Sequence, residues 1–400
     1  MAKKIGVIGL SSNTNVGDYL LVETTKFLLK NISQSSTFID IDIHPIAQDS
    51  YRGSKKINFM VYKFMRRSEP KVFKIIRNQH LRYFYQSLYW KIKLGWYFKK
   101  TIRNLDALIL SGGGFIKFRT QGLNYLDQMV IRTANKNGIP VMFNAVGVEG
   151  YDEKDIRCQK LKKALNNPIV KVITTRDDIE TLQSNYLKGN TGVVSARVAD
   201  PVLWLDSYTK RISKPSKKLI GINLINPLNF KAYGGQYSPA QIENFYKNLI
   251  NELQVLDQDF VLFSNGMKVD QQLGKKLVKD LNLPVTSLLT LPASSEELIG
   301  VLRKFDILFA ARMHAGITAT ALGLDTIGLI WSEKIEYFAT IFGLRRNYFN
   351  EAEIDYRVIA KRLAKRDTDN VDKKTLEEMK QKTVLNLKDF LISVGVKDAG

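Results

Sequence analysis

The sequence contains one cysteine, three histidines and no long apolar run. The single cysteine, Cys158, excludes an intramolecular disulfide and indicates a reducing compartment. His44, His80 and His314 lack the spacing of a structural zinc site, so no metal is expected. No window holds about 18 uninterrupted apolar residues, and the apolar stretch after Met1 is too short for the core of a signal peptide. These absences predict a cytoplasmic protein.

The composition is that of a globular chain with a strongly basic segment. The 400 residues are 44% hydrophobic and 25% charged, which excludes a disordered or fibrous chain and allows two separate cores. Lys and Arg number 60 against 39 Asp and Glu, a net charge of +21. Residues 52–103 hold 15 of the basic residues, 12 aromatic residues and a single acid, Glu69. The basic character therefore needs a local explanation.

Short apolar runs alternate with amphipathic stretches, a pattern typical of parallel sheets covered by helices. A Lys-, Ser- and Pro-rich stretch at 210–218 indicates a linker between two such series. The expected fold is α/β, with two Rossmann-like domains facing a cleft. The expected divisions are residues 1–209, which include the basic aromatic insert at 52–103, residues 210–370, and a C-terminal helix in 371–400. The expected strands are 4–10, 38–46, 107–110, 141–146, 170–174, 193–199, 219–224, 260–264, 306–310 and 326–330.

The first loop after a strand carries Asn15, Gly17 and Asp18. Glycine permits close backbone approach, and the following helix presents N–H groups to an anion, so these residues are candidates for substrate binding. A simple helix cap explains the same residues equally well. Gly6 and Gly9 lack the third glycine of the dinucleotide fingerprint, so NAD binding is not expected.

Gly112, Gly113 and Gly114 follow the strand expected at 107–110. Glycines at the carboxyl end of a strand expose backbone N–H groups, which suits contact with a phosphate or a sugar hydroxyl. The alternative is a tight packing turn. Because α/β sheets bind their ligands at this edge, the functional interpretation is favoured.

The turn at residues 310–316 combines Arg312 and His314 with small neighbours between a strand and a helix. A cation beside a titratable imidazole at a helix N-terminus forms an anion site with an acid–base group. Arg176 also follows a strand and is a second candidate cation. Its alternative role is an ion pair with Asp177 or Asp178.

The order of these motifs resembles the polysaccharide pyruvyl transferase family over about residues 4–345. The motifs are Asn-x-Gly-Asp in the first loop, Ser-Gly-Gly-Gly at 111–114, Thr-Arg-Asp at 175–177, Ala-Asp-Pro at 199–201, Arg-Met-His-Ala at 312–315, Ala-Leu-Gly at 321–323 and Trp-Ser-Glu-Lys at 331–334. The resemblance implies a fold similar to GT-B glycosyltransferases. It also implies transfer of pyruvate from phosphoenolpyruvate to a sugar of a cell-surface polysaccharide, or of its lipid-linked precursor, as a ketal.

The residues are consistent with that chemistry. Phosphoenolpyruvate carries a carboxylate and a phosphate, which Arg176, Arg312 and the N–H groups near Met313 can bind. His314 is the candidate general acid, and Lys334 is a further candidate for substrate binding. Phosphoenolpyruvate is the donor, and no cofactor is expected.

Two other functions are compatible with the sequence. One is a GT-B glycosyltransferase that uses a nucleotide sugar, with the 312–316 turn holding a diphosphate. The other is a nucleic-acid-binding protein that uses the insert at 52–103. The same insert suits docking to an anionic membrane surface or a polyprenyl-diphosphate-linked glycan, at the inner face of the cell membrane. The alternative is that the insert forms a pair of solvated basic helices with a purely structural role.

Overall fold

The computed structural model describes residues 2–10, 15–43, 78–119, 122–209, 218–229 and 235–399. The expectations for residues 52–77 and for most of the linker, 210–217, lie outside these ranges. The chain forms two compact units, here called unit 1 and unit 2. Unit 1 comprises Met1–Ser12, Thr25–Ala199 and Gln381–Gly400, and unit 2 comprises Asn13–Thr24 and Asp200–Lys380.

Unit 1 is built on a six-stranded parallel sheet with the order β2-β1-β3-β4-β5-β6. Its central strands are almost wholly buried and apolar, as expected for strands covered on both faces. In register, Ile5 of β1 lies opposite Ala107 of β3, and Leu108 of β3 lies opposite Val141 of β4. The strands are β1 (Lys4–Gly9), β2 (Thr37–Asp42), β3 (Ala107–Ser111), β4 (Val141–Val146), β5 (Val170–Thr175) and β6 (Val194–Arg197).

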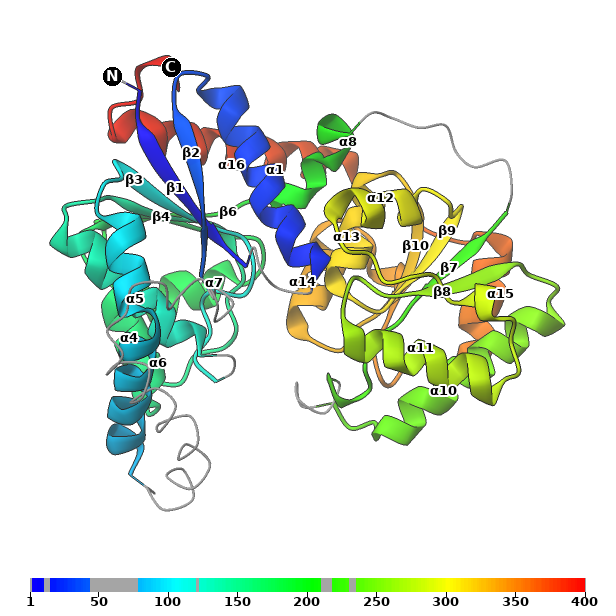
Figure 1. Cartoon of the computed structure of the whole chain (residues 1–400). Helices are drawn as coiled ribbons and strands as arrows, with labels where there is room; N and C mark the ends of the chain where they lie inside the picture. The colour runs from blue at the N-terminus through cyan, green and yellow to red at the C-terminus, as the bar shows by residue number, and fades with distance from the viewer. Residues whose placement is uncertain are drawn as a thin grey trace. The chain divides into compact units, whose positions relative to one another are not determined.

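Helices cover both faces of this sheet (Figure 1). Parallel strands are joined by right-handed crossovers, so the reversal of strand order at β1 places α1 on one face and α4, α5 and α6 on the other. α4 packs against α5, and α5 packs against α6. The helices are α1 (Val16–Ile32), α4 (Gln79–Ile102), α5 (Leu123–Lys136), α6 (Ile156–Leu165), α7 (Ile179–Thr181) and α16 (Lys373–Ser393).

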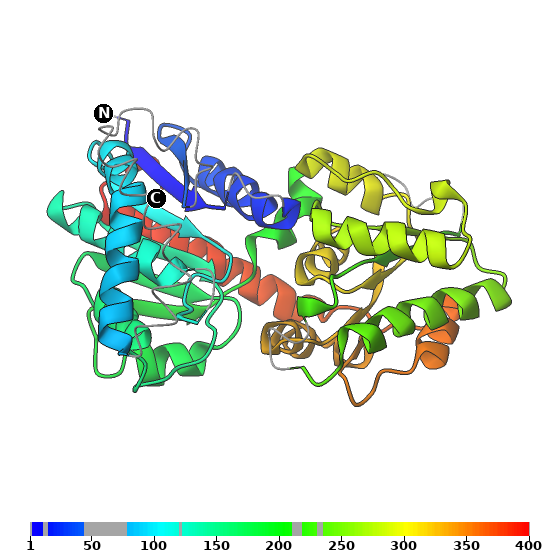
Figure 2. The same ribbon diagram turned by 60° about the horizontal axis from the view of Figure 1, so that its bottom comes forward.

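Unit 2 has a five-stranded parallel sheet with the order β11-β10-β9-β7-β8. α10 and α15 pack together beside it (Figures 1 and 2). The strands are β7 (Ile220–Asn223), β8 (Phe260–Phe263), β9 (Ile307–Ala310), β10 (Asp325–Leu329) and β11 (Tyr348–Phe349). The helices are α8 (Leu205–Tyr208), α10 (Pro239–Val255), α11 (Lys268–Asp280), α12 (Ser295–Leu302), α13 (Met313–Ala321), α14 (Glu333–Ile341) and α15 (Tyr356–Lys365).

The expected α/β class with two parallel sheets is confirmed. The ten expected strands correspond to β1 to β10, although the part of the second one beyond residue 43 lies outside the described ranges. α4 occupies the described part of the insert, as the helical alternative weighed for that segment expects, whereas the two-residue β11 was not predicted. Within the described ranges, no helix is both long enough and apolar enough to cross a membrane.

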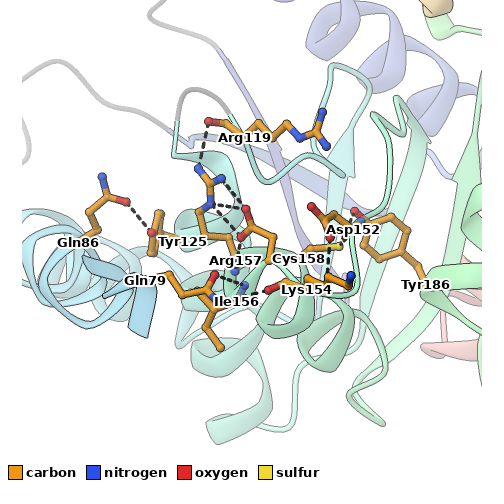
Figure 3. A network of polar contacts seen from close by, with 11 residues as sticks. Gln79, Gln86, Arg119, Tyr125, Asp152, Lys154, Ile156, Arg157, Cys158 and Tyr186 are labelled. Atoms are coloured by element: carbon orange, nitrogen blue, oxygen red, sulfur yellow. Dashed lines mark hydrogen bonds and ion pairs between the residues drawn. The ribbon is translucent and has the colours of Figure 1, made fainter. Parts of the chain in front are cut away.

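Cys158 is buried in the core of unit 1. Its Sγ donates to the hydroxyl of Tyr186 at 3.5 Å and accepts the N–H of Asp152 at 3.4 Å (Figure 3). Tyr186 in turn donates to the carbonyl of Gly150 at 3.0 Å. The one cysteine of the chain therefore serves the packing of α6.

Candidate functional site

A histidine–aspartate pair lies in unit 2, where α13 begins. His314, in the first turn of α13, places Nδ1 3.3 Å from Oδ1 of Asp18, in the first turn of α1. The side chains are only 9% and 16% exposed, so water screens their interaction weakly. A carboxylate facing Nδ1 favours a proton on that nitrogen and orients the imidazole ring.

Asp18 is held in place by its own loop. Asn15 Nδ2 donates to Asp18 Oδ2 at 3.0 Å, and the N–H of Asp18 donates to the carbonyl of Asn15 at 3.1 Å. The N–H of Val16 donates to the carbonyl of Asn265, in the loop after β8, at 2.9 Å. These bonds fix the start of α1 against the loops of unit 2.

Gly17 allows the start of α1 to approach His314. A Cβ atom at this position would lie 2.5 Å from His314 Cβ and 3.0 Å from His314 Cγ. Real Cβ contacts of that length essentially do not occur, so any side chain at position 17 must displace the imidazole or the helix start. The expected importance of this glycine therefore has a steric basis.

We expect Gly17→Ala to lower turnover about 100-fold, because a displacement of about 1 Å at a catalytic group has effects of this size. Gly300→Ala is the matched control, since Gly300 lies in α12 and a Cβ atom added there would meet no atom within 4 Å. The control should retain activity and gain a little helix stability. Steady-state kinetics on both variants test this, and unchanged turnover in Gly17→Ala would contradict the steric role.

Arg312 forms a buried ion pair that the sequence did not reveal. Its Nε donates to Asp270 Oδ2 at 2.9 Å and its Nη2 donates to Asp270 Oδ1 at 2.8 Å. The side chain of Asp270 is fully buried and that of Arg312 is 14% exposed. This two-point geometry fixes the plane of the guanidinium and neutralises much of its charge.

Two asparagines at the ends of neighbouring strands complete this frame. Asn223, the last residue of β7, accepts the N–H of Arg312 through Oδ1 at 2.9 Å. Its Nδ2 donates to Asn265 Oδ1 at 2.9 Å. Strand order reverses between β7 and β9, and the carboxyl ends of strands at such a reversal are where open α/β sheets bind ligands.

Met313 and Lys334 flank the Arg312 turn. Met313 is the first residue of α13 and is 9% exposed, and Lys334 is half-buried in the first turn of α14. Trp331 Nε1 donates to the carbonyl of Ala311 at 2.5 Å. This bond joins the loop that precedes Lys334 to the loop that precedes Arg312.

The glycine run in unit 1 forms a bonded turn. Gly112 and Gly113 have positive φ angles of 56° and 72°, which glycine adopts without strain. The N–H of Gly112 donates to the carbonyl of Asn144 at 2.8 Å, and the carbonyl of Gly113 accepts the N–H of Gly147 at 2.6 Å. A Cβ at Gly114 would lie 2.8 Å from Oε1 of Glu149. Packing therefore accounts for much of this run, and substrate contact by Gly112 to Gly114 stays a prediction.

Arg176 lies in unit 1 directly after β5 and is 6% exposed. Burial raises the pKa of the neighbouring Asp177, and the charge of Arg176 opposes that rise. Asp177 Oδ1 accepts the N–H of Val148 at 2.9 Å and the hydroxyl of Thr175 at 2.8 Å. The ion pair of Arg176 with Asp177 or Asp178 and a substrate role for Arg176 both stay predictions.

Asp127 of α5 is a buried acid in unit 1, and neither carboxyl oxygen has a hydrogen-bond partner within the described ranges. Burial raises its pKa well above the usual value, and Lys117 opposes the shift. The protonated Asp127 carboxyl contributes its full stability below the pKa that this group has in the unfolded chain, about 4. This contribution is lost as the pH rises through the higher pKa of the folded protein. Asp127→Asn should therefore gain stability over the natural chain as the pH rises.

Thermal unfolding between pH 5 and pH 8 measures this effect, with an expected gain of about 1–3 kcal/mol at the upper end. Glu378→Gln, at an exposed position of α16, is the control and should follow the natural chain at every pH. A difference between Asp127→Asn and the natural chain that stays constant with pH would contradict the assignment.

The structure brings together one set of the predicted residues in unit 2. Asn15 bonds to Asp18, Asp18 and Gly17 each lie against His314, and Arg312 is two residues from His314. Gly112 to Gly114 and Arg176 lie in unit 1 at the carboxyl edge of its own sheet. Asp270, Asn223 and Asn265 were not predicted from the sequence. The two asparagines each follow or end an apolar strand, a position that could have marked them.

The unit 2 site therefore offers an oriented acid–base group, a fixed guanidinium and the start of a helix. A proton donor beside N–H groups that favour negative charge suits reactions of anionic substrates. Within the described ranges, no cluster of three or more His, Cys, Asp or Glu side chains could hold a metal ion.

Solved structures with the same fold span the whole chain. MnaA of S. aureus, solved with UDP, has a TM-score of 0.52 and 11% identity, covering 99% of this chain and 98% of its own. The UDP-GlcNAc 2-epimerase of Methanocaldococcus jannaschii, in complex with UDP-GlcNAc and UDP, has a TM-score of 0.52 and 10% identity, covering 98% and 100%. At these identities the likeness shows the fold alone. The chain is thus an α/β protein of the same two-sheet class.

The sequence assigns the family. The model of the polysaccharide pyruvyl transferase family matches residues 15–333, and the chain belongs to this family. No curated protein matches the chain significantly in sequence. The matched range contains Asn15, Asp18, Arg312 and His314, so the paired groups of unit 2 lie within the part of the chain that defines the family.

Proposed function

We propose that this chain transfers pyruvate from phosphoenolpyruvate to two hydroxyl groups of one sugar, which forms a ketal and releases phosphate. The acceptor is a sugar of a cell-surface polysaccharide or of its lipid-linked precursor. Membership in the polysaccharide pyruvyl transferase family supports this proposal. The observation that carries it for this chain is the His314–Asp18 pair at the start of α13.

The reaction requires two proton transfers. A proton adds to the methylene carbon of phosphoenolpyruvate, and the oxygen of one sugar hydroxyl bonds to the adjacent carbon. The oxygen of a second hydroxyl then bonds to the same carbon, while the bond between that carbon and the phosphate oxygen breaks. Of the two hydroxyl protons released, one balances the new methyl hydrogen and the other leaves with the phosphate, so the overall reaction is proton-neutral.

His314 is the group proposed to donate the first proton. Asp18 faces Nδ1 and orients the imidazole, and Nε2 is the nitrogen proposed to exchange the proton with the substrate. The same nitrogen then accepts a proton from an attacking hydroxyl, which regenerates the acid. Arg312 and the first N–H groups of α13 are proposed to bind the phosphate or carboxylate of the donor.

The test is phosphate release from phosphoenolpyruvate by the purified full chain, with and without an acceptor glycan. We expect acceptor-dependent release together with a new ketal methyl signal in the NMR spectrum of the product. UDP-sugars as the only donor should give no product. Glycosyl transfer from a UDP-sugar without phosphoenolpyruvate would overturn the proposal and favour a glycosyltransferase.

A further inference from the structure

A groove between α4 and α5 of unit 1 is a second candidate site, separate from the His314 turn. Its volume is about 590 Å³. The two helices run in parallel, because Tyr83 stacks on Tyr125 near their starts and Gly95 lies against Met129 further along. Its lining comes from α4, from α5 and from the residue that directly follows each helix.

The groove is strongly cationic. Five basic residues line it and no acidic residue does; the five are Lys91, Lys99, Arg103, Arg132 and Lys136. Within the described ranges, no ion pair joins any of the five to a carboxylate. Five such charges in one concave surface repel one another unless an anion lies among them.

An exposed apolar stripe lies beside the groove on α4. Leu81, Phe84, Leu88 and Trp96 are exposed by 57%, 66%, 39% and 37%. Their spacing of three, four and eight residues places them on one side of the helix. Apart from Trp96, which belongs to both, the groove residues of α4 recur every four positions from Tyr83, so the stripe is about one residue's rotation away.

The walls of the groove are fixed by side-chain bonds at the start of both helices. Tyr83 donates its hydroxyl to Gln128 of α5, and Tyr125 donates its hydroxyl to Gln86 of α4. Gln79 Nε2 donates to the carbonyl of Lys154 at 3.3 Å, which ties α4 to the loop before α6 (Figure 3). These bonds hold the starts of the two helices together at one end of the groove.

We propose that the groove and stripe bind the surface of an anionic phospholipid bilayer. The five cations hold lipid phosphate groups, and the exposed Leu, Phe and Trp side chains enter the boundary between head groups and acyl chains. Charge complementarity excludes a second copy of this face as the partner, since like charges would meet. Nucleic acid would use the cations and aromatic rings but would leave Leu81 and Leu88 in water. Membrane binding is independent of the proposed pyruvyl transfer.

Vesicle flotation with the full chain tests this proposal. We expect the chain to float with vesicles of phosphatidylglycerol and phosphatidylcholine but not with pure phosphatidylcholine, and to be released by high salt. Each cation near an anionic membrane strengthens binding about fivefold, so the double variant Lys99→Gln with Arg132→Gln should bind about 25-fold more weakly. Lys275→Gln with Lys279→Gln, at exposed positions of α11 in unit 2, is the matched control and should bind as the natural chain does.

A second variant separates the apolar part from the charged part. Leu81→Ser with Phe84→Ser should lower flotation while leaving the salt dependence in place. Equal binding to neutral vesicles, or full binding by the Lys99 and Arg132 variant, would overturn the proposal. So would binding of single-stranded DNA or of inorganic pyrophosphate in the groove with no binding to anionic vesicles. Transfer to a soluble acceptor should be unchanged in all these variants, so this test and that of the proposed function fail separately.

Discussion

Replacing His314 by alanine is expected to lower the rate of pyruvyl transfer by about 100- to 10,000-fold, the usual contribution of a positioned acid–base group. The reason lies in its setting, where a nearly buried imidazole faces the Asp18 carboxylate at 3.3 Å. The rate of phosphate release under saturating substrate measures the effect. His80→Ala, which removes an exposed histidine of α4 in unit 1, is the matched control and should retain full activity with a soluble acceptor.

A double-mutant comparison separates a proton-transfer role from simple loss of structure. If Asp18 acts through His314, Asp18→Asn should lower the rate in the natural chain and change little in the His314→Ala background. Thermal unfolding of each variant checks that unit 2 is still folded. Near-normal turnover of His314→Ala, or fully additive effects of the two changes, would remove the acid–base assignment.

Replacing Asp270 by alanine is expected to destabilise the protein by about 3–5 kcal/mol, because it leaves the Arg312 guanidinium buried without its partner. The N–H of Asn226, which donates to Asp270 Oδ1 at 2.7 Å, loses its acceptor as well. Urea unfolding measures the loss. Glu353→Ala is the matched control, since it breaks the exposed pair with Arg345 and should cost about 1 kcal/mol or less.

The companion variant replaces both partners. Asp270→Leu with Arg312→Leu should recover much of the stability, because two apolar side chains leave no unpaired buried charge. It should still lack transfer activity if Arg312 binds the donor. If the double variant is as unstable as Asp270→Ala, the ion pair does more than cancel two buried charges and itself contributes to the stability of unit 2.

The central strands of both sheets were predictable because their residues are buried on both faces. Val141–Val146 is apolar at every position except Asn144 and is β4 in the structure with the same bounds. β11 was not predictable, since two residues carry no periodic pattern. A helix in the insert was expected only as the structural alternative, because the mixture of basic and aromatic residues also suits a surface that binds an anionic partner.

The candidate site was predictable where several charged or titratable side chains lie close together in the sequence. Arg312 and His314 stand together among small residues, and the Asn15 to Asp18 loop carries a glycine between polar groups. Asp270 was not, because it lies in the polar start of α11 and acquires its importance only through Arg312, 42 positions away. Pairings at that distance arise from the packing of β7, β8 and β9, which a local pattern does not encode.

The division of α1 between the two units governs how this protein can be dissected. Residues 13–24 belong to unit 2, whereas the helix continues from Thr25 into unit 1, where Thr25 accepts a hydrogen bond from Ser111 at 2.6 Å. Expressing the chain as two fragments cut in the 210–218 stretch would leave His314 on one fragment and Asp18 on the other. If the two fragments are mixed, the His314–Asp18 pair can form only when the start of α1 binds to the unit 2 fragment. A minimal unit 2 must therefore include residues 13–24, fused to it as an added segment.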